Sequence, residues 1–124
     1  MSRPAKAVSK VSGVDFVRVV ESRQQAERVS GLRFSVWVGE SDDEPRGHAE
    51  RLHAGLEAPD RSVYLVCNTR QRALEIVTGP KARSTLTDEE CEQATRSMRD
   101  LLARGDVSEA LVQGLSHLGT YALD

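Results

Sequence analysis

The first third of the chain changes from a helical to a strand pattern of hydrophobic positions. Apolar residues recur near helical spacing up to Gly31, the usual residue just past a helix end, so a helix is predicted over 15–30. The β-branched run 14–20 leaves an extended start open. Residues 32–38, LRFSVWV, alternate strictly and predict a strand. One face of that strand would carry Leu32, Phe34, Val36 and Val38.

The middle third predicts a second helix and two further strands. Pro45 suits the first turn of a helix that would run to about residue 57. The nearly continuous apolar run 62–67 is typical of a central strand, and 73–78 predicts a third strand. The short polar link between these two strands favours an antiparallel hairpin. The helical connection between the first two strands implies a parallel pair with a right-handed crossover.

The last third predicts two amphipathic helices separated at Gly105, with Asp106 as the next N-cap. Their apolar stripes are Cys91, Ala94, Met98, Leu101 and Leu102, then Ala110, Leu111, Leu115, Leu118 and Ala122. The element order αβαββαα predicts an α/β fold in which helices cover a small mixed β-sheet. We expect a single α/β domain over 14–124, a size that suits one hydrophobic core.

Trp37 and Tyr64 fall on the less apolar faces of their predicted strands. They would line a shallow groove for a partner or pack beneath a second layer of helix. A sheet covered on both faces favours packing.

Composition excludes several classes of function. The chain of 124 residues has 17 basic and 19 acidic side chains, so no basic surplus supports general nucleic-acid binding. No apolar run is long enough to predict insertion into a membrane. Residues 1–13 are basic without an apolar core, which predicts a flexible arm and not a secretory signal. The expected location is cytoplasmic. The arm leaves open contact with an anionic partner.

The stretch EIVTGPKARSTLTDEEC, residues 75–91, is a candidate phosphate loop because glycine, cations and hydroxyls lie between a predicted strand and helix. It lacks the GxxxxGK[ST] and GxGxxG patterns. Thr87 and Glu90 have the spacing of a capping box, and acids in the first helical turn would repel phosphate. A capped strand-to-helix turn is the favoured interpretation. The candidate anion-binding residues are Lys81, Arg83 and Ser84.

Four acidic residues are candidate ligands for Ca²⁺ or Mg²⁺, which prefer oxygen donors. They are Glu40, Asp42, Asp88 and Asp106. The acidic loop lacks EF-hand spacing, and as solvated caps these side chains need no metal, so no cofactor is expected to be required. His48 and His53 are five residues apart on a predicted helix, which places them on different faces and argues against a zinc pair.

Three strings carry a resemblance to a known family: SGLRFSVWVG (30–39), RSVYLVCNTRQRALEIVTGPKARSTLTDEECEQA (61–94) and ARGDVSEALVQGLSHLG (103–119). They resemble the TPM domain, which includes a thylakoid-lumen phosphatase-like protein of photosystem repair, and are most similar to an actinobacterial branch of unknown function. The resemblance implies a TPM-like sandwich. It also implies acid-phosphatase activity with divalent cations in some relatives, with Asp88 and Asp106 at matching positions.

Two functions are therefore expected. The first is a non-enzymatic TPM-like module that binds an unknown protein partner or a ligand, with a homodimer as one form. The alternative is a weak, metal-assisted phosphomonoesterase. In that case Asp88 and Asp106 would hold the cation, and Lys81 or Arg83 would orient the anion.

Overall fold

A computed structural model describes residues 13–123 of the chain, and the basic arm predicted for 1–13 lies, except for Gly13, outside them. The predicted order of elements is confirmed. In chain order they are α1 (Phe16–Ser30), β1 (Arg33–Gly39), α2 (Pro45–Ala54), β2 (Ser62–Asn68), β3 (Ala73–Thr78), α3 (Asp88–Ala103) and α4 (Val107–Tyr121), with short 3-10 turns at Pro59–Arg61 and Ala82–Ser84.

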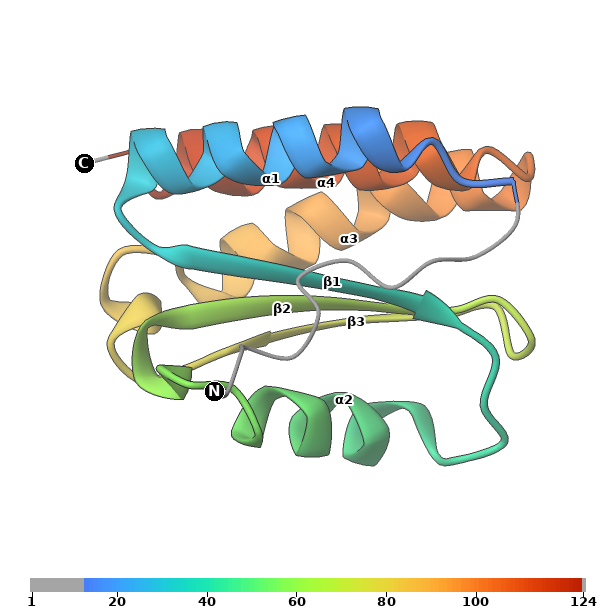
Figure 1. Cartoon of the computed structure of the whole chain (residues 1–124), viewed down its shortest axis with the longest axis horizontal. Coiled ribbons are helices and arrows are strands. Elements are labelled where there is room, and N and C mark those ends of the chain that lie inside the picture. The colour runs from blue at the N-terminus through green and yellow to red at the C-terminus, as the bar shows by residue number, and fades with distance from the viewer. Residues whose placement is uncertain (1–12, 124) are drawn as a thin grey trace.

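The three strands form one mixed sheet in the order β1-β2-β3. β1 pairs with β2 in parallel, from Arg33 opposite Ser62 to Gly39 opposite Asn68. β2 pairs with β3 in antiparallel, as the short hairpin link predicts. Figure 1 shows α1, α3 and α4 on one face of the sheet and α2 on the other. The fold is therefore a three-layer α/β arrangement with unequal outer layers.

The main core lies between the sheet and the three helices. α4 packs against both α1 and α3, so it is the central helix of this layer. The sheet contributes Phe34, Val36, Val38, Val63, Leu65, Cys67, Leu74 and Ile76. Since Phe34, Val36 and Val38 share one face of β1, the predicted alternation of that strand is confirmed.

A second, smaller core lies between the sheet and α2. It contains Ala49, Leu56, Tyr64, Val66 and Val77, with Trp37 and Leu52 packed against it. Tyr64 is 1% exposed, and the half-buried Trp37 ring meets His48 edge-on at 4.8 Å between ring centroids. The aromatic side chains therefore pack beneath the second helical layer and do not line a groove.

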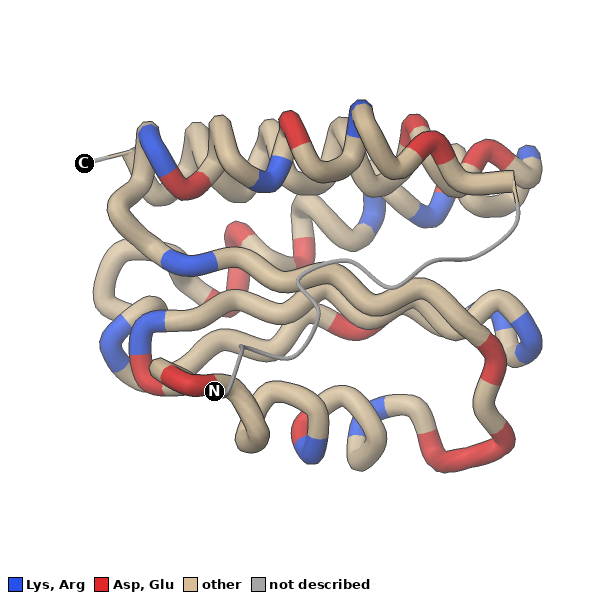
Figure 2. The backbone as a smooth tube through the Cα atoms, viewed as in Figure 1, with Lys and Arg blue, Asp and Glu red and all other residues tan. Residues whose placement is uncertain are grey.

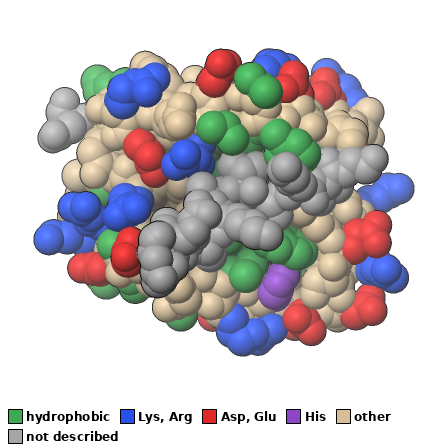
Figure 3. Space-filling model, in the orientation of Figure 1, with side chains coloured by type: hydrophobic (Ala, Val, Ile, Leu, Met, Phe, Trp, Pro, Cys, Tyr) green, Lys and Arg blue, Asp and Glu red, His purple; other side chains and the backbone are tan. Residues whose placement is uncertain are grey.

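Both edges of the sheet carry arginine–carboxylate pairs from neighbouring elements. On β1, the Phe34 amide donates to the Glu27 carboxylate at 2.8 Å, and Glu27 is paired with Arg23 at 3.1 Å. On β3, Arg46 donates to the Ile76 carbonyl at 3.1 Å and pairs with Glu75. Charged groups at strand edges discourage pairing with further strands. Elsewhere on the surface, basic and acidic side chains are interspersed on the face that Figure 3 shows.

The structure fixes the start of the first helix and the end of the second. The first helix begins at Phe16 because the Asp15 carboxylate accepts from the Arg18 amide, so the extended alternative for 14–20 is wrong. The second helix ends at Ala54, not near 57, because the chain turns at Gly55 and buries Leu56 in the smaller core. Within residues 13–123, no helix has both the length and the apolar character that a membrane crossing needs.

Candidate functional site

The loop between β3 and α3, which carries the predicted anion-binding residues, turns its backbone amides inward. Each of the five amides from Lys81 to Leu86, Ala82 apart, donates to a carbonyl oxygen. Their acceptors are Asp60, Gly79, Lys81 and Ala82, the last of which accepts twice. A phosphate cradle needs such amides free and convergent. This loop therefore offers no backbone nest for an anion.

Two of the three candidate anion-binding side chains in this loop also form hydrogen bonds to nearby backbone carbonyls. Arg83 donates to the Thr78 carbonyl at 2.8 Å, and the Ser84 hydroxyl donates to the Lys81 carbonyl at 2.7 Å. Lys81 is exposed. A Cβ on Gly79 would overlap the carbonyl oxygens of Pro59 and Asp60, so glycine is needed there for close backbone packing. The stretch is built as a strand-to-helix junction.

The predicted capping box is confirmed. The Glu90 amide donates to the Thr87 hydroxyl at 3.1 Å, and the Thr87 amide donates to the Glu90 carboxylate at 3.0 Å. With Asp88 and Glu89 also in the first turn of α3, three carboxylates complement the positive end of the helix dipole. Helix α3 thus satisfies its own N-terminus.

The structure does not bring the four predicted cation ligands together. Glu40 and Asp42 both lie by Arg70, at 3.2 and 3.7 Å, in the acidic loop before α2 that Figure 2 shows. Asp88 and Asp106 lie at opposite ends of α3, whose 16 residues span about 24 Å. Asp106 caps α4 by accepting from the Glu109 amide. Among residues 13–123, no three His, Cys, Asp or Glu side chains are grouped to hold a metal. Asp88 and Asp106 therefore cannot share one cation, as the phosphomonoesterase hypothesis requires.

Neither cysteine is an activated nucleophile. Cys67 and Cys91 are buried and free. Burial raises the pKa of each thiol to about 11, and Asp88 and Glu90 add to the rise at Cys91. Thiols with raised pKa values stay protonated and weakly reactive at neutral pH. Both side chains act as small apolar groups of the core.

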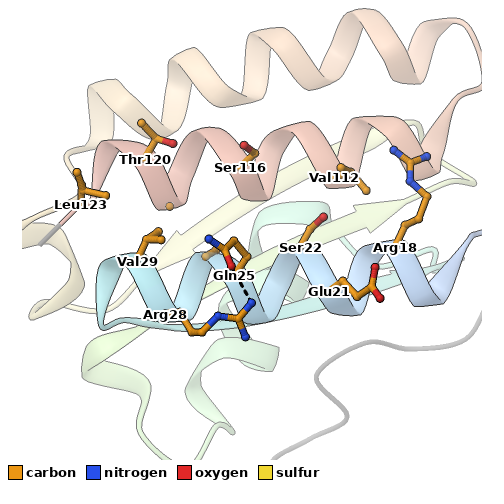
Figure 4. A pocket seen from close by; sticks show the side chains of 12 residues that line it. Arg18, Glu21, Ser22, Gln25, Arg28, Val29, Val112, Ser116, Thr120 and Leu123 are labelled. Atoms are coloured by element: carbon orange, nitrogen blue, oxygen red, sulfur yellow. Dashed lines mark hydrogen bonds between the residues drawn. The ribbon is translucent and has the colours of Figure 1, made fainter.

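A groove runs along the outer surface between α1 and α4, which are parallel and side by side (Figure 4). At one end, Asp15 donates its amide to the Ser108 hydroxyl at 2.9 Å, and Arg18 pairs with Glu109 at 2.7 Å. Further along, a Cβ on Gly119 would stand 3.1 Å from the Ala26 Cβ, so the two helices touch there. We call this the α1–α4 groove. Its volume is about 670 Å³.

The two walls of the α1–α4 groove differ in chemistry. The α1 wall is mostly polar and charged: Arg18, Glu21, Ser22, Gln25, Ala26, Arg28 and Val29. The α4 wall has no charged side chain: Val112, Ser116, Gly119, Thr120 and Leu123, the last just beyond the helix. Leu123 is 65% exposed, and within residues 13–123 Val17 is the only other large hydrophobic residue that is exposed. The result is a neutral wall of small and apolar side chains facing a charged rim.

Only some of the charged side chains on the rim form ion pairs within the chain. The Glu109 carboxylate, which hydrogen-bonds Arg18, raises the pKa of that guanidinium and has its own pKa lowered in return. Arg28 donates to the Gln25 side chain at 2.7 Å, the dashed line in Figure 4. Within residues 13–123, Glu21 and Arg28 form no ion pair. One anionic and one cationic group are therefore left at the groove.

The sequence reasoning placed its candidate residues in loops and missed this groove. A signal was present in the stretch that became α4, VSEALVQGLSHLGTY, whose only charged residue is Glu109. In a chain with 29% charged residues, an outer helix usually carries more charge on its exposed side. The exposed Ser116 and Thr120 are uncharged. What the sequence did not show is which helix lies beside α4.

Solved structures show the same fold at low sequence identity. The BA42 protein of the psychrophilic bacterium Bizionia argentinensis is 12% identical, with a TM-score of 0.76 over 91% of this chain and 84% of that one. The N-terminal domain of the cg2496 protein of Corynebacterium glutamicum is 15% identical, with a TM-score of 0.75 over 93% and 78%. An N-terminal domain from P. gingivalis is 20% identical, with a TM-score of 0.73 over 94% and 81%. These likenesses show the fold alone.

The resemblance to the TPM domain is wrong as an assignment of family. The family model that matches, over residues 5–119, is described as "Domain of unknown function (DUF5130)". No curated protein matches the chain. Several residues in the strings that suggested TPM lie at the ends of strands and helices. Gly39 ends β1, Gly79 follows β3, and Thr87 and Asp106 are the N-caps of α3 and α4. Glycine beside strands and Thr or Asp at helix N-caps are common in many unrelated domains.

Proposed function

The chain belongs to the DUF5130 family, whose function is unknown, and we propose that this domain is a protein-interaction module that self-associates through the α1–α4 groove. The observation that carries the proposal is the uncharged α4 wall, with Ser116, Thr120 and Leu123 exposed, beside Glu21 and Arg28 of α1, which form no ion pair within the described part of the chain. The central part of a protein interface is typically depleted in charge and surrounded by polar groups. The groove has this distribution.

The floor of the groove supports a helical occupant. Ser22, Ala26, Ser116 and Gly119 are small, so a third helix can approach α1 and α4 closely. Val29, Val112 and Leu123 supply apolar surface that such a helix would remove from water. A second copy of this chain brings its own α1 to the groove.

The charge pattern of α1 favours a second copy as the occupant. Glu21 and Arg28 are seven residues apart, about two helical turns, so both lie on the groove side of α1. If two α1 helices cross in antiparallel about a two-fold axis between Gln24 and Gln25, each Glu21 faces the partner's Arg28. A two-fold interface repeats every contact, so two ion pairs form. The same surface is thus complementary to itself.

Sedimentation over a range of concentrations tests the proposal. The wild-type chain is expected to show a concentration-dependent monomer–dimer equilibrium. Glu21→Arg and Arg28→Glu each replace two attractions by two repulsions, and we expect each to weaken the dimer by about tenfold or more. The double variant E21R/R28E restores opposite charges across the axis and should restore association.

The control is a charge swap of the same kind on α3. Glu92 and Arg96 are exposed, pair at 3.2 Å and lie outside the groove, so E92R/R96E should associate as the wild type does. A chain that stays monomeric at every concentration overturns the proposal. So does a dimer that the single swaps in α1 leave unchanged, or that the double swap fails to rescue.

A further inference from the structure

A second hollow lies at the opposite side of the three-helix layer from α1, between the β2–β3 hairpin and the turn from α3 to α4. Figure 1 shows both turns at the same end of the molecule. The hollow has a volume of about 430 Å³, within the usual size of small-ligand sites. We call it the hairpin hollow. It shares no lining residue with the α1–α4 groove.

The charges that line the hairpin hollow are of one sign. Arg72 comes from the hairpin and Arg99 from α3, and no lining residue is acidic. Neither guanidinium forms an ion pair within the part of the chain that the structure describes. Asp106 lies between lining residues in sequence but is not part of the lining; its carboxylate caps α4 by accepting from the Glu109 amide at 3.2 Å. Two cationic side chains thus line one hollow in a chain whose net charge is −2.

Two other pockets of the described region are lined by charges of both signs. The α1–α4 groove contains Glu21 with its arginines, and a hollow beside β3 combines Arg46 and Arg99 with Glu75, Asp88 and Glu92. Arg99 lines both the hollow beside β3 and the hairpin hollow, whereas Arg72 lines only the hairpin hollow of these three. The hairpin hollow has no carboxylate in its lining, so an anion from outside is the partner that its two guanidinium groups would accept there.

The backbone at Arg72 adds a separate observation. Arg72 has a φ of 52°, and no other non-glycine residue between 13 and 123 has a positive φ. Left-handed backbone disfavours residues with a Cβ, and glycine or asparagine usually occupies such a turn position. Here the chain places a long cation at a position where glycine would fit with less strain.

The remaining lining combines two polar residues, Asn68 and Thr69, with small and apolar ones. Cys67 lies at 2% exposure in the main core, and Leu102 and Val107 are half-buried against the same core. An ion held only by charge needs no such surface. Apolar walls with a few polar groups are typical of sites for small organic ligands.

We propose that the hairpin hollow binds a small organic anion, with its oxyanion head on Arg72 and Arg99 and its apolar body against Leu102 and Val107. An oxyanion accepts two parallel hydrogen bonds from one guanidinium, so two arginines hold a carboxylate or a phosphate monoester firmly. The apolar surface then makes the site bind a ligand with a hydrocarbon chain more tightly than the bare ion.

Titration followed by ¹H–¹⁵N NMR of the full chain tests this site with four probes. Hexanoate and hexyl phosphate carry the apolar body, whereas acetate and inorganic phosphate do not. The probes with a body should shift resonances of residues 67–72 and 99–107 and bind at least about tenfold more tightly than their bare counterparts. The difference between hexanoate and hexyl phosphate identifies the preferred head group.

Three variants make the result specific. Arg72→Gly removes a guanidinium and relieves the left-handed backbone, so this variant should keep its unfolding temperature or raise it while binding falls by about tenfold or more. Arg99→Gln should lose binding to a similar extent. Arg96→Gln removes the same charge one turn away on α3, outside the hollow, and should bind as the wild type does.

Each contrary outcome is decisive. If the probes cause no shifts around the hollow, or R96Q weakens binding as much as R72G and R99Q do, the proposal is overturned. If acetate binds as tightly as hexanoate and phosphate as tightly as hexyl phosphate, the apolar component is wrong and with it the organic ligand. The dimer proposal is unaffected by these results, because the two sites share no residues.

Discussion

The two faces of the sheet are covered in different ways. On one face, α1, α3 and α4 bury a continuous apolar core that reaches all three strands. Among residues 13–123, α2 is the only α-helix on the other face, where it packs on β2 and β3. Polar groups take part there: His53 is hydrogen-bonded to the Ser62 carbonyl at 3.0 Å, and Arg46 links α2 to β3.

This difference indicates which layer holds the fold together. Burial of apolar surface is the dominant favourable term in folding, and the three-helix face has far more of it. The α2 layer depends more on hydrogen bonds and ion pairs, whose net contributions are small. We therefore expect the three-helix face to set global stability and the α2 layer to open locally at lower cost.

The largest effect should come from Leu115→Ala in α4. Leu115 is fully buried in the main core, and removing its side chain should lower the free energy of unfolding by about 2–5 kcal/mol. Urea denaturation followed by circular dichroism measures the loss. The exposed Gln93 of α3, changed to Ala, is the control and should shift stability by less than about 0.5 kcal/mol. Equal effects of the two substitutions would contradict the assignment of the core to this face.

A smaller loss is expected from Leu56→Ala beneath α2. Leu56 is 8% exposed and follows the end of the helix, where the chain can relax into the space left behind. The expected loss is at the low end of the range for such substitutions, about 2 kcal/mol. Hydrogen exchange should show faster exchange at the amides of α2 while α4 stays protected. If exchange rises equally in both helices, the two layers unfold together and the comparison fails.

Much of this architecture could be predicted from the sequence because its signals are local. Strand 32–38 alternates, strand 62–67 is continuously apolar, and Thr87 with Glu90 forms a capping box that depends on residues three apart. The end of α2 was misplaced because Leu56 continues the helical spacing of apolar residues. Its burial is achieved by a turn at Gly55 that periodicity does not distinguish from a further helical turn.

The candidate sites were harder to predict because they depend on pairs of elements far apart in the sequence. Arg72 and Arg99 line one hollow only because the hairpin ends beside α3, and Glu21 and Ser116 line one groove only because α1 lies along α4. Conversely, the acidic residues that looked alike in the sequence are kept apart. Asp88 begins α3 whereas Asp106 follows its far end and caps α4, and Glu40 forms an ion pair with Arg70.

Helix caps allow a finer comparison of the two layers. On the three-helix side, Thr87→Ala removes the hydroxyl that caps α3, and we expect a loss of about 1 kcal/mol in urea denaturation. Glu89→Gln in the same turn removes a charge but no capping hydrogen bond, so its effect should be smaller. A larger loss for E89Q would mean that the dipole, and not the cap, stabilises this helix start.

On the α2 side the cap is a carboxylate, so its contribution should depend on pH. The Glu44 side chain accepts from the amides of Gly47 and Arg46, and these bonds lower its pKa below the ordinary 4.5. A lowered pKa in the folded state means that the stabilisation is present above the unfolded-state pKa and is lost as pH falls through the folded-state value.

Glu44→Gln should therefore lower the unfolding temperature at neutral pH by the smallest amount of the four stability changes, because Glu44 is exposed and glutamine still accepts a hydrogen bond. The deficit relative to the wild type should shrink as the carboxylate is protonated in acid. The deficit of T87A should persist over the same range, since a hydroxyl cap carries no charge. Thermal denaturation of the three proteins from neutral to acidic pH measures both trends. A constant deficit for E44Q would show that the Glu44 cap does not act through its charge, and the two layers would then be capped by the same physics.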